Sequence, residues 1–163
     1  MLVAYLAPQA SGNTWYPLSF LSPIPRNEPG ITSGLGVLAR LVAELDAEGV
    51  AADRVGLVGF SQGACLSLEF AARQARRYAG VAGLSGGLIG PPGTPRNYPG
   101  SMAGTPVFLG CSDIDPHIPL ERVQESAAVF RQLAADVDAR IYPQMGHTIA
   151  GDEIEAVRKM FSR

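Results

Sequence analysis

The chain has few of the residues on which several kinds of site depend. Its 163 residues include only two cysteines, Cys65 and Cys111, and only two histidines, His117 and His147. Neither cysteine belongs to a Cys-x-x-Cys pair or a histidine cluster, which disfavours a disulfide framework, a redox pair and a metal centre. We therefore expect two buried, reduced thiols, no metal and no cofactor.

Charge and long apolar runs are also scarce. The formal net charge is −2 and no basic cluster occurs, which disfavours nucleic acid and anionic membranes as partners. The longest apolar stretches, such as residues 1–7, are far too short to span a bilayer, so we expect no membrane insertion. That stretch also lacks the positive charges of a signal peptide, and the first cationic residue is Arg26, which favours a cytoplasmic location.

The composition nevertheless suffices for a core. With 163 residues and 47% hydrophobic content, we expect one globular domain over residues 1–163. Strand-like and helix-like segments alternate, which predicts an α/β fold with a mostly parallel sheet flanked by helices. The strands are expected in residues 2–6, 55–58, 79–84, 106–110 and 139–142, and the helices in residues 31–45, 61–78, 120–133 and from about 152 onward. The last helix has Asp152 as its expected N-cap, with Glu155 as the capping-box partner.

Ser61 lies in the run Gly59-Phe60-Ser61-Gln62-Gly63, after a strand-like segment and before a helix-like one. That setting is the one that a G-x-S-x-G nucleophile elbow requires. Glycines let strand and helix pass closely at so tight a turn, and the turn exposes the serine hydroxyl. The backbone N–H of Gln62 would point to the place where an oxyanion forms, while its side chain is expected to face solvent or to bond at the helix start.

A serine nucleophile needs a base and an acid that orients the base. His147 and two carboxylates, Asp113 and Asp115, each follow a strand-like run. Serine, aspartate and histidine in this order, each just past a strand, are typical of α/β-hydrolases, and parallel strands bring such residues to one edge of the sheet. We interpret Ser61 as the nucleophile and His147 as the base, and the pattern leaves both aspartates open as the acid.

These motifs resemble those of the carboxylesterase/phospholipase group of α/β-hydrolases, which includes acyl-protein thioesterases. The resemblance covers nearly the whole chain and rests on Ala7–Pro17, Gly59–Ala64, Asp113–Pro119 and Met145–His147. Carried over by position, it implies Ser61 as nucleophile, His147 as base and Asp115 as acid. Asp115 is preferred because Asp-Pro-x-Ile-Pro matches the acid loop of the family, and Asp113 is the alternative.

The resemblance implies a cofactor-independent serine hydrolase that cleaves small-molecule carboxylic esters of short to medium acyl chains through an acyl-enzyme. Thioesters and lysophospholipids are alternative substrates within the same chemistry, and a peptidase is disfavoured because no peptide clamp or cap insertion is evident. Trp15, Tyr16, Leu88 and Ile89 are candidates for the acyl or alcohol pocket, with ordinary core packing as the alternative for each.

One family feature is missing from the sequence. The family carries a His-Gly-x-Gly loop that supplies a second oxyanion N–H, and no His-Gly pair occurs here. We therefore expect an N-terminally shortened hydrolase fold with a gap beside the elbow strand. Three arrangements would close the gap: direct pairing with the strand at residues 2–6, a second copy of the chain in a homo-oligomer, or a longer natural protein.

The missing loop also bears on activity. A substitute oxyanion donor is expected in the loop near Ala10–Gly12. Without a working oxyanion site, the chain would be a non-catalytic domain for ligand binding or assembly, which is the alternative to a hydrolase.

Overall fold

The computed structural model describes residues 3–162, in which strands and helices alternate as the sequence predicts. The strands are β1 (Gly56–Phe60), β2 (Gly80–Leu84), β3 (Pro106–Ser112) and β4 (Asp136–Tyr142). The helices are α1 (Gly30–Ala47), α2 (Gln62–Arg73), α3 (Leu120–Gln132) and α4 (Gly151–Phe161), with short 3-10 turns η1 (Ser11–Asn13), η2 (Ile24–Asn27) and η3 (Ala52–Arg54). Within residues 3–162, none of the helices combines the length and apolar character that a bilayer crossing requires.

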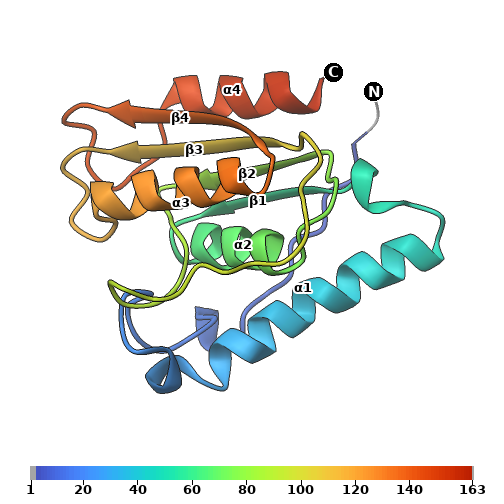
Figure 1. The fold of residues 1–163 in the computed structure, drawn as a ribbon, viewed down its shortest axis with the longest axis horizontal. Coiled ribbons are helices and arrows are strands. Elements are labelled where there is room, and N and C mark those ends of the chain that lie inside the picture. The colour runs from blue at the N-terminus through green and yellow to red at the C-terminus, as the bar shows by residue number, and fades with distance from the viewer. Residues whose placement is uncertain (1–2, 163) are drawn as a thin grey trace.

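The four strands form one parallel sheet whose spatial order, β1-β2-β3-β4, is also their order in the chain. All carboxyl ends of the strands therefore lie at the same edge of the sheet (Figure 1). The segments that leave this edge begin at Ser61 after β1, at Ser85 after β2, at Asp113 after β3 and at Pro143 after β4. The topology alone thus gathers the candidate residues at one end of the molecule.

Helices cover both faces of the sheet. α2 and α3 pack on one face around a core that includes Leu68, Val81 and Phe130, and α4 packs on the other face around Phe108. α1 lies outside α2, away from the sheet (Figure 1). Because both faces of the two inner strands are covered, β2 is buried at every position and β3 at all but the first, which fits their largely apolar sequences.

The two edge strands differ in character. β4 carries Asp138 and Arg140 on its exposed side, and Arg140 forms ion pairs with Asp138 at 2.7 Å and with Asp152 of α4 at 2.8 Å. β1 carries no charge, and its Val58 and Phe60 side chains are 51% and 39% exposed. Charged side chains on an edge discourage pairing with another strand, so β4 is protected in a way that β1 is not.

The expected first strand is not formed. Residues 3–7 make no ladder with any described strand, and Val3, Tyr5 and Leu6 are 50%, 89% and 59% exposed, while residues 1 and 2 lie outside the described residues. A strand needs backbone partners as well as apolar side chains, and residues 3–7 do not pair with the open edge of β1. Direct pairing of the N-terminal segment with β1 is therefore wrong for this structure, and the other two arrangements stay predictions.

The stretch that follows, residues 8–29, is a packed loop. Tyr16 and Phe20 are only 2% and 5% exposed, and both belong to the core on the α2 side of the sheet. The aromatic side chains thus fix residues 8–29 to the domain although this stretch holds no strand or α-helix, only the short turns η1 and η2.

Two helix boundaries differ from the predictions. α2 ends at Arg73 rather than near Tyr78, because Tyr78 is fully buried and its N–H donates to the hydroxyl of Thr105 at 2.9 Å. This long-range contact takes the chain out of the helix. α4 begins at Gly151, with Ala150 rather than Asp152 as its N-cap. Its capping carboxylate is Glu153, which accepts the N–H of Ala150 at 2.6 Å, rather than Glu155.

Candidate active site

Ser61 occupies a strained position between β1 and α2. Its backbone has φ 53° and ψ −121°, a conformation that costs free energy for a residue with a side chain. Its N–H donates to the carbonyl of Leu84 at 2.9 Å, which ties the turn to the end of β2. A Cβ at Gly59 would collide with the backbone of Gly63, so strand and helix pass too closely there for a side chain.

Ser61, His147 and Asp115 lie in one line of hydrogen bonds. Nε2 of His147 is 2.9 Å from Oγ of Ser61, and Nδ1 of His147 is 2.7 Å from Oδ2 of Asp115. Because a carboxylate only accepts, Nδ1 carries the ring proton, and Nε2 is left to accept the serine hydroxyl. The His147 side chain is 20% exposed whereas that of Asp115 is fully buried.

The Asp115 carboxylate is held by several donors. Oδ1 accepts the backbone N–H of His117 at 2.8 Å and that of Ile118 at 3.0 Å, and the Cys111 thiol lies 3.8 Å from Oδ2. Burial acts to raise the pKa of Asp115, but the hydrogen bonds from His147 and the two N–H groups outweigh it and hold the pKa below its ordinary value. The carboxylate is therefore charged at neutral pH and fixed in orientation.

Asp113, the alternative acid, has a different place. Its Oδ1 accepts the backbone N–H of Gln144 at 2.8 Å, whereas the ring nitrogens of His147 are bonded to Asp115 and Ser61. The hydroxyl of Ser112 accepts the N–H of Gly146 at 3.0 Å. The side chains of Asp113 and Ser112 therefore brace the loop that carries His147 against the end of β3.

Two rings flank the imidazole of His147. The ring centroid of Phe60 lies 5.0 Å away at a tilt, and that of His117 lies 4.8 Å away, edge to face. These contacts limit rotation of the imidazole. His117 is exposed.

Contrary to the expectation that it faces solvent, the side chain of Gln62 is hydrogen-bonded to a distant segment of the chain. Its Oε1 accepts the N–H of Trp15 at 2.8 Å, and its Nε2 donates to the carbonyl of Tyr16 at 2.8 Å. The hydroxyl of Thr14 lies 3.2 Å from the same Nε2. Both ends of the amide are thus bonded to a segment 46 to 48 residues away in the chain. No local sequence pattern predicts this contact.

The four predicted pocket residues lie in unequal surroundings. Trp15 is half-buried, whereas Tyr16, Leu88 and Ile89 are 2%, 0% and 1% exposed and belong to the core. Contact of these residues with a substrate stays a prediction. The expected second donor region, Ala10–Gly12, overlaps the exposed turn η1 and also stays a prediction.

Buried charges that the sequence analysis did not single out hold the segment after β2. Glu69 of α2 accepts the N–H of Ile89 at 3.0 Å, and Arg122 of α3 donates to the carbonyl of Leu88 at 2.7 Å. Arg122 also pairs with Glu125 at 2.6 Å, and Glu69 pairs with Arg73 at 2.7 Å. Helical periodicity alone gives no indication of these charges, because they lie among apolar positions that face the core.

Several known proteins are similar to this chain in sequence. A family model described as phospholipase/carboxylesterase matches residues 4–163. An acyl-protein thioesterase 1 of Gibberella zeae is 33% identical over 120 residues, which are 70% of this chain and 49% of that protein. An acyl-protein thioesterase 1 of Saccharomyces cerevisiae is 27% identical over 129 residues, which are 77% of this chain and 56% of that protein. The chain thus spans about half the length of these two relatives.

A solved structure agrees in fold. The phospholipase/carboxylesterase from Dyadobacter fermentans superposes with a TM-score of 0.92 at 44% sequence identity. The match covers 96% of this chain and 75% of that one. The four-stranded parallel sheet and its helices therefore correspond to a large part of that α/β-hydrolase structure.

Proposed function

Because this chain belongs to the phospholipase/carboxylesterase family of α/β-hydrolases, we propose that it hydrolyses carboxylic esters with Ser61 as the nucleophile. In this proposal His147 is the general base and acid, Asp115 orients His147, and residues 1–163 act as one domain. The observation that carries the proposal is the unbroken line from Ser61 Oγ through the His147 ring to Asp115, with distances of 2.9 and 2.7 Å.

Acylation follows from this line. Oγ of Ser61 attacks the carbonyl carbon of the ester while His147 Nε2 takes the hydroxyl proton, and the carbonyl electrons move to its oxygen. The tetrahedral adduct then expels the alcohol, which leaves with the proton from His147. Asp115 stabilises the charged imidazole that exists between these two proton transfers, and its low pKa keeps it anionic while it does so.

Deacylation repeats the sequence with water. His147 takes a proton from the water as its oxygen attacks the acyl carbon, and collapse of the second adduct breaks the bond to Ser61. The serine oxygen regains the proton from His147, and the carboxylic acid leaves. No group other than the ester and water is consumed, so the cycle needs no cofactor.

The negative oxygen of each adduct needs a donor. The backbone N–H of Gln62 is the first of α2, and the first N–H groups of a helix have no partner within the helix. This N–H is the proposed oxyanion donor, with a second from Ala10–Gly12. Loss of one such donor costs other hydrolases about 10²–10³ in rate, so a single donor supports slow turnover.

The substrates we propose are small-molecule esters with short to medium acyl chains. Both relatives described above are named acyl-protein thioesterases, which favours thioesters as the second candidate, with lysophospholipids as a further alternative. The same serine, histidine and aspartate serve all three substrate classes, because each reaction passes through an acyl-enzyme.

Labelling with a fluorophosphonate tests the proposal, since this reagent phosphonylates an activated serine. We expect stoichiometric labelling that is lost in Ser61→Ala and in His147→Ala, with hydrolysis of p-nitrophenyl butyrate lost in parallel. Far-UV circular dichroism serves as the control that both variants fold. A folded chain that is neither labelled nor active would instead indicate the non-catalytic alternative, and full activity of Ser61→Ala would disprove the assignment. Relative rates on p-nitrophenyl and thioester substrates then separate the first two substrate classes.

A further inference from the structure

The side-chain amide of Gln62 makes a two-point contact with a distant piece of backbone. Its Oε1 accepts the N–H of Trp15 and its Nε2 donates to the carbonyl of Tyr16, both at 2.8 Å. One amide thus satisfies a backbone donor and a backbone acceptor of two adjacent residues. The Thr14 hydroxyl, itself bonded to the carbonyl of Tyr16 at 2.8 Å, completes the contact.

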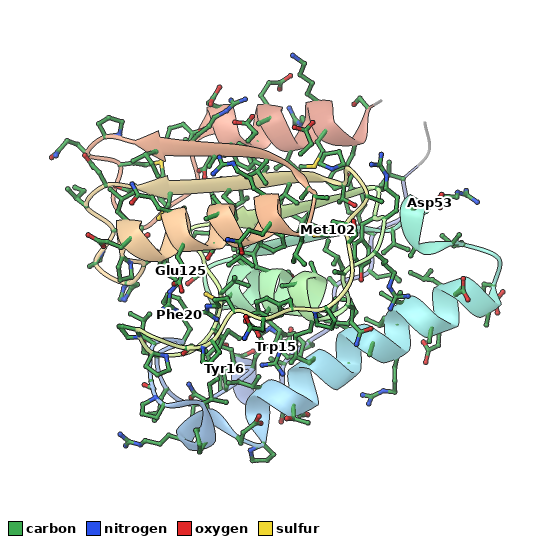
Figure 2. All side chains as sticks on the ribbon, viewed as in Figure 1. Trp15, Tyr16, Phe20, Asp53, Met102 and Glu125 are labelled. Atoms are coloured by element: carbon green, nitrogen blue, oxygen red, sulfur yellow. The ribbon has the colours of Figure 1, made fainter. Side chains whose placement is uncertain are left out.

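The other side of the same segment is held by α1. A Cβ at Gly30 would come within 2.7 Å of the carbonyl oxygen of Trp15, which shows how closely the helix start approaches the segment. A Cβ at Gly34 would meet Leu66 of α2 at 3.1 Å and the indole of Trp15 at 3.4 Å. Trp15 accordingly lies between α1 and α2 (Figure 2). Residues 14–16 are therefore fixed from one side by α1 and from the other by one amide.

Gln62 directly follows Ser61 in the chain, so the held segment lies within one side-chain length of the nucleophile turn. We propose that the Gln62 side chain is a positioning residue that sets residues 14–16 as the wall against which the substrate of Ser61 rests. The role is separate from that of the Gln62 backbone N–H, which a change of side chain leaves in place. The inference rests on the proposed function only in that Ser61 acts on a substrate. The hydrogen-bonded contact between the Gln62 side chain and residues 14–16, called the clamp below, is a property of the fold.

Fluorescence of Trp15 reports on the clamp directly, because Trp15 is the only tryptophan in the chain. In Gln62→Met the side chain keeps its approximate size and loses both hydrogen bonds. We expect the tryptophan emission to shift to longer wavelength and acrylamide quenching to increase at least twofold. The matched control is Gln124→Met, the same change at an exposed position of α3, which should leave the emission unchanged.

Kinetics test the consequence for the substrate. Loss of the two hydrogen bonds in Gln62→Met is expected to raise KM for p-nitrophenyl butyrate about tenfold, with a smaller change in kcat, since Ser61, His147 and the Gln62 N–H are retained. Gln62→Glu keeps the acceptor for Trp15 but turns an oxygen toward the Tyr16 carbonyl, so it should show the same KM effect. Titration of active sites with a fluorophosphonate corrects kcat for misfolded protein, which lowers the apparent kcat but leaves KM unchanged.

The outcomes separate the two hypotheses. Unchanged quenching and unchanged KM in folded Gln62→Met and Gln62→Glu would overturn the inference. A loss of active sites alone, at constant KM, would also overturn it, because it would reduce Gln62 to a stabilising residue. A wild-type chain that neither reacts with a fluorophosphonate nor cleaves esters would refute the proposed function, and unchanged Trp15 quenching would then refute the clamp independently.

Discussion

Asp113 accepts the backbone N–H of Gln144 at 2.8 Å, three residues before the histidine that Asp115 contacts through its side chain. Two neighbouring carboxylates thus hold the same loop at different points. One fixes the backbone of the loop and the other fixes the imidazole. This division gives the two aspartates separable roles.

Substitution of each aspartate by asparagine tests the division. In Asp115→Asn an amide faces Nδ1 of His147, which favours the wrong tautomer, and kcat should fall about 10⁴-fold. In Asp113→Asn an amide oxygen still accepts the N–H of Gln144, so kcat should change less than about threefold. Hydrolysis of p-nitrophenyl butyrate at pH 8 measures both. The reverse order of effects would make Asp113 the acid.

The two glycines of the nucleophile turn are expected to differ in tolerance. A Cβ at Gly59 would collide with the backbone of Gly63, so Gly59→Ala should lower the free energy of unfolding by about 3 kcal/mol, the upper range for overpacking. A Cβ at Gly63 meets nothing within 4 Å, and the residue lies in α2, where alanine is favoured over glycine by about 1 kcal/mol. Gly63→Ala should therefore be at least as stable as the wild type. Urea unfolding of the pair decides this, and equal destabilisation would contradict it.

Glu153 should make stability fall as pH rises. Its side chain is fully buried, Oε1 has no hydrogen-bond partner among the described residues, and burial raises the pKa above its ordinary value. A raised pKa in the folded state favours the protonated acid, so its stabilising contribution is present at pH 4 and is lost as pH rises through the folded-state pKa. A glutamine in place of the acid stays neutral, so we expect Glu153→Gln to be more stable than the wild type by about 1 kcal/mol at pH 8 and equal to it at pH 4.

The control for this experiment is Glu155→Gln on the same helix. The Glu155 side chain is 73% exposed, so its neutralisation should change the free energy of unfolding little at either pH. Urea unfolding at pH 4, 6 and 8 gives the comparison. A Glu153→Gln variant less stable than the wild type at pH 8 would show that the charged carboxylate is stabilised where it lies.

Both thiols should be inert in the folded chain. Cys65 and Cys111 are 1% and 0% exposed. Burial, first of all, raises the pKa of Cys65 to about 11 and that of Cys111 to about 12, so neither is a thiolate at pH 8. Ellman's reagent should find no reactive thiol in the native protein and two after denaturation. Rapid reaction of one thiol in the native state would mean that its segment opens.

Much of this fold follows from local sequence signals. Apolar runs and helical spacing predict β1 to β4 and the four helices, because each element buries a face of its own. Ser61 and His147 are found in the same way, since each follows a strand whose end position the topology fixes. The structure adds that Asp115, rather than Asp113, lies against the imidazole, which the resemblance of the acid loop favoured and strand position alone left open.

The remaining features depend on partners far away in the chain. The apolar residues 3–7 satisfy the pattern of a strand, but a strand forms only where a neighbour offers its backbone. The bonds of the Gln62 amide join residues 46 to 48 positions apart. The burial of Glu69 and Arg122 likewise requires the segment after β2 to come between α2 and α3. None of these contacts has a local signature.

The strands follow one another in the same order in the sheet and in the chain, so the sheet can be built in the order of synthesis. Ser61 and His147 are separated by 86 residues, and β1 can recruit β2, and β2 can recruit β3, while β4 is still being made. A nascent chain at that stage contains Ser61 but lacks His147, the base that would activate it. On the proposed mechanism, hydrolysis therefore cannot start before β4 has joined the sheet and placed His147 beside Ser61.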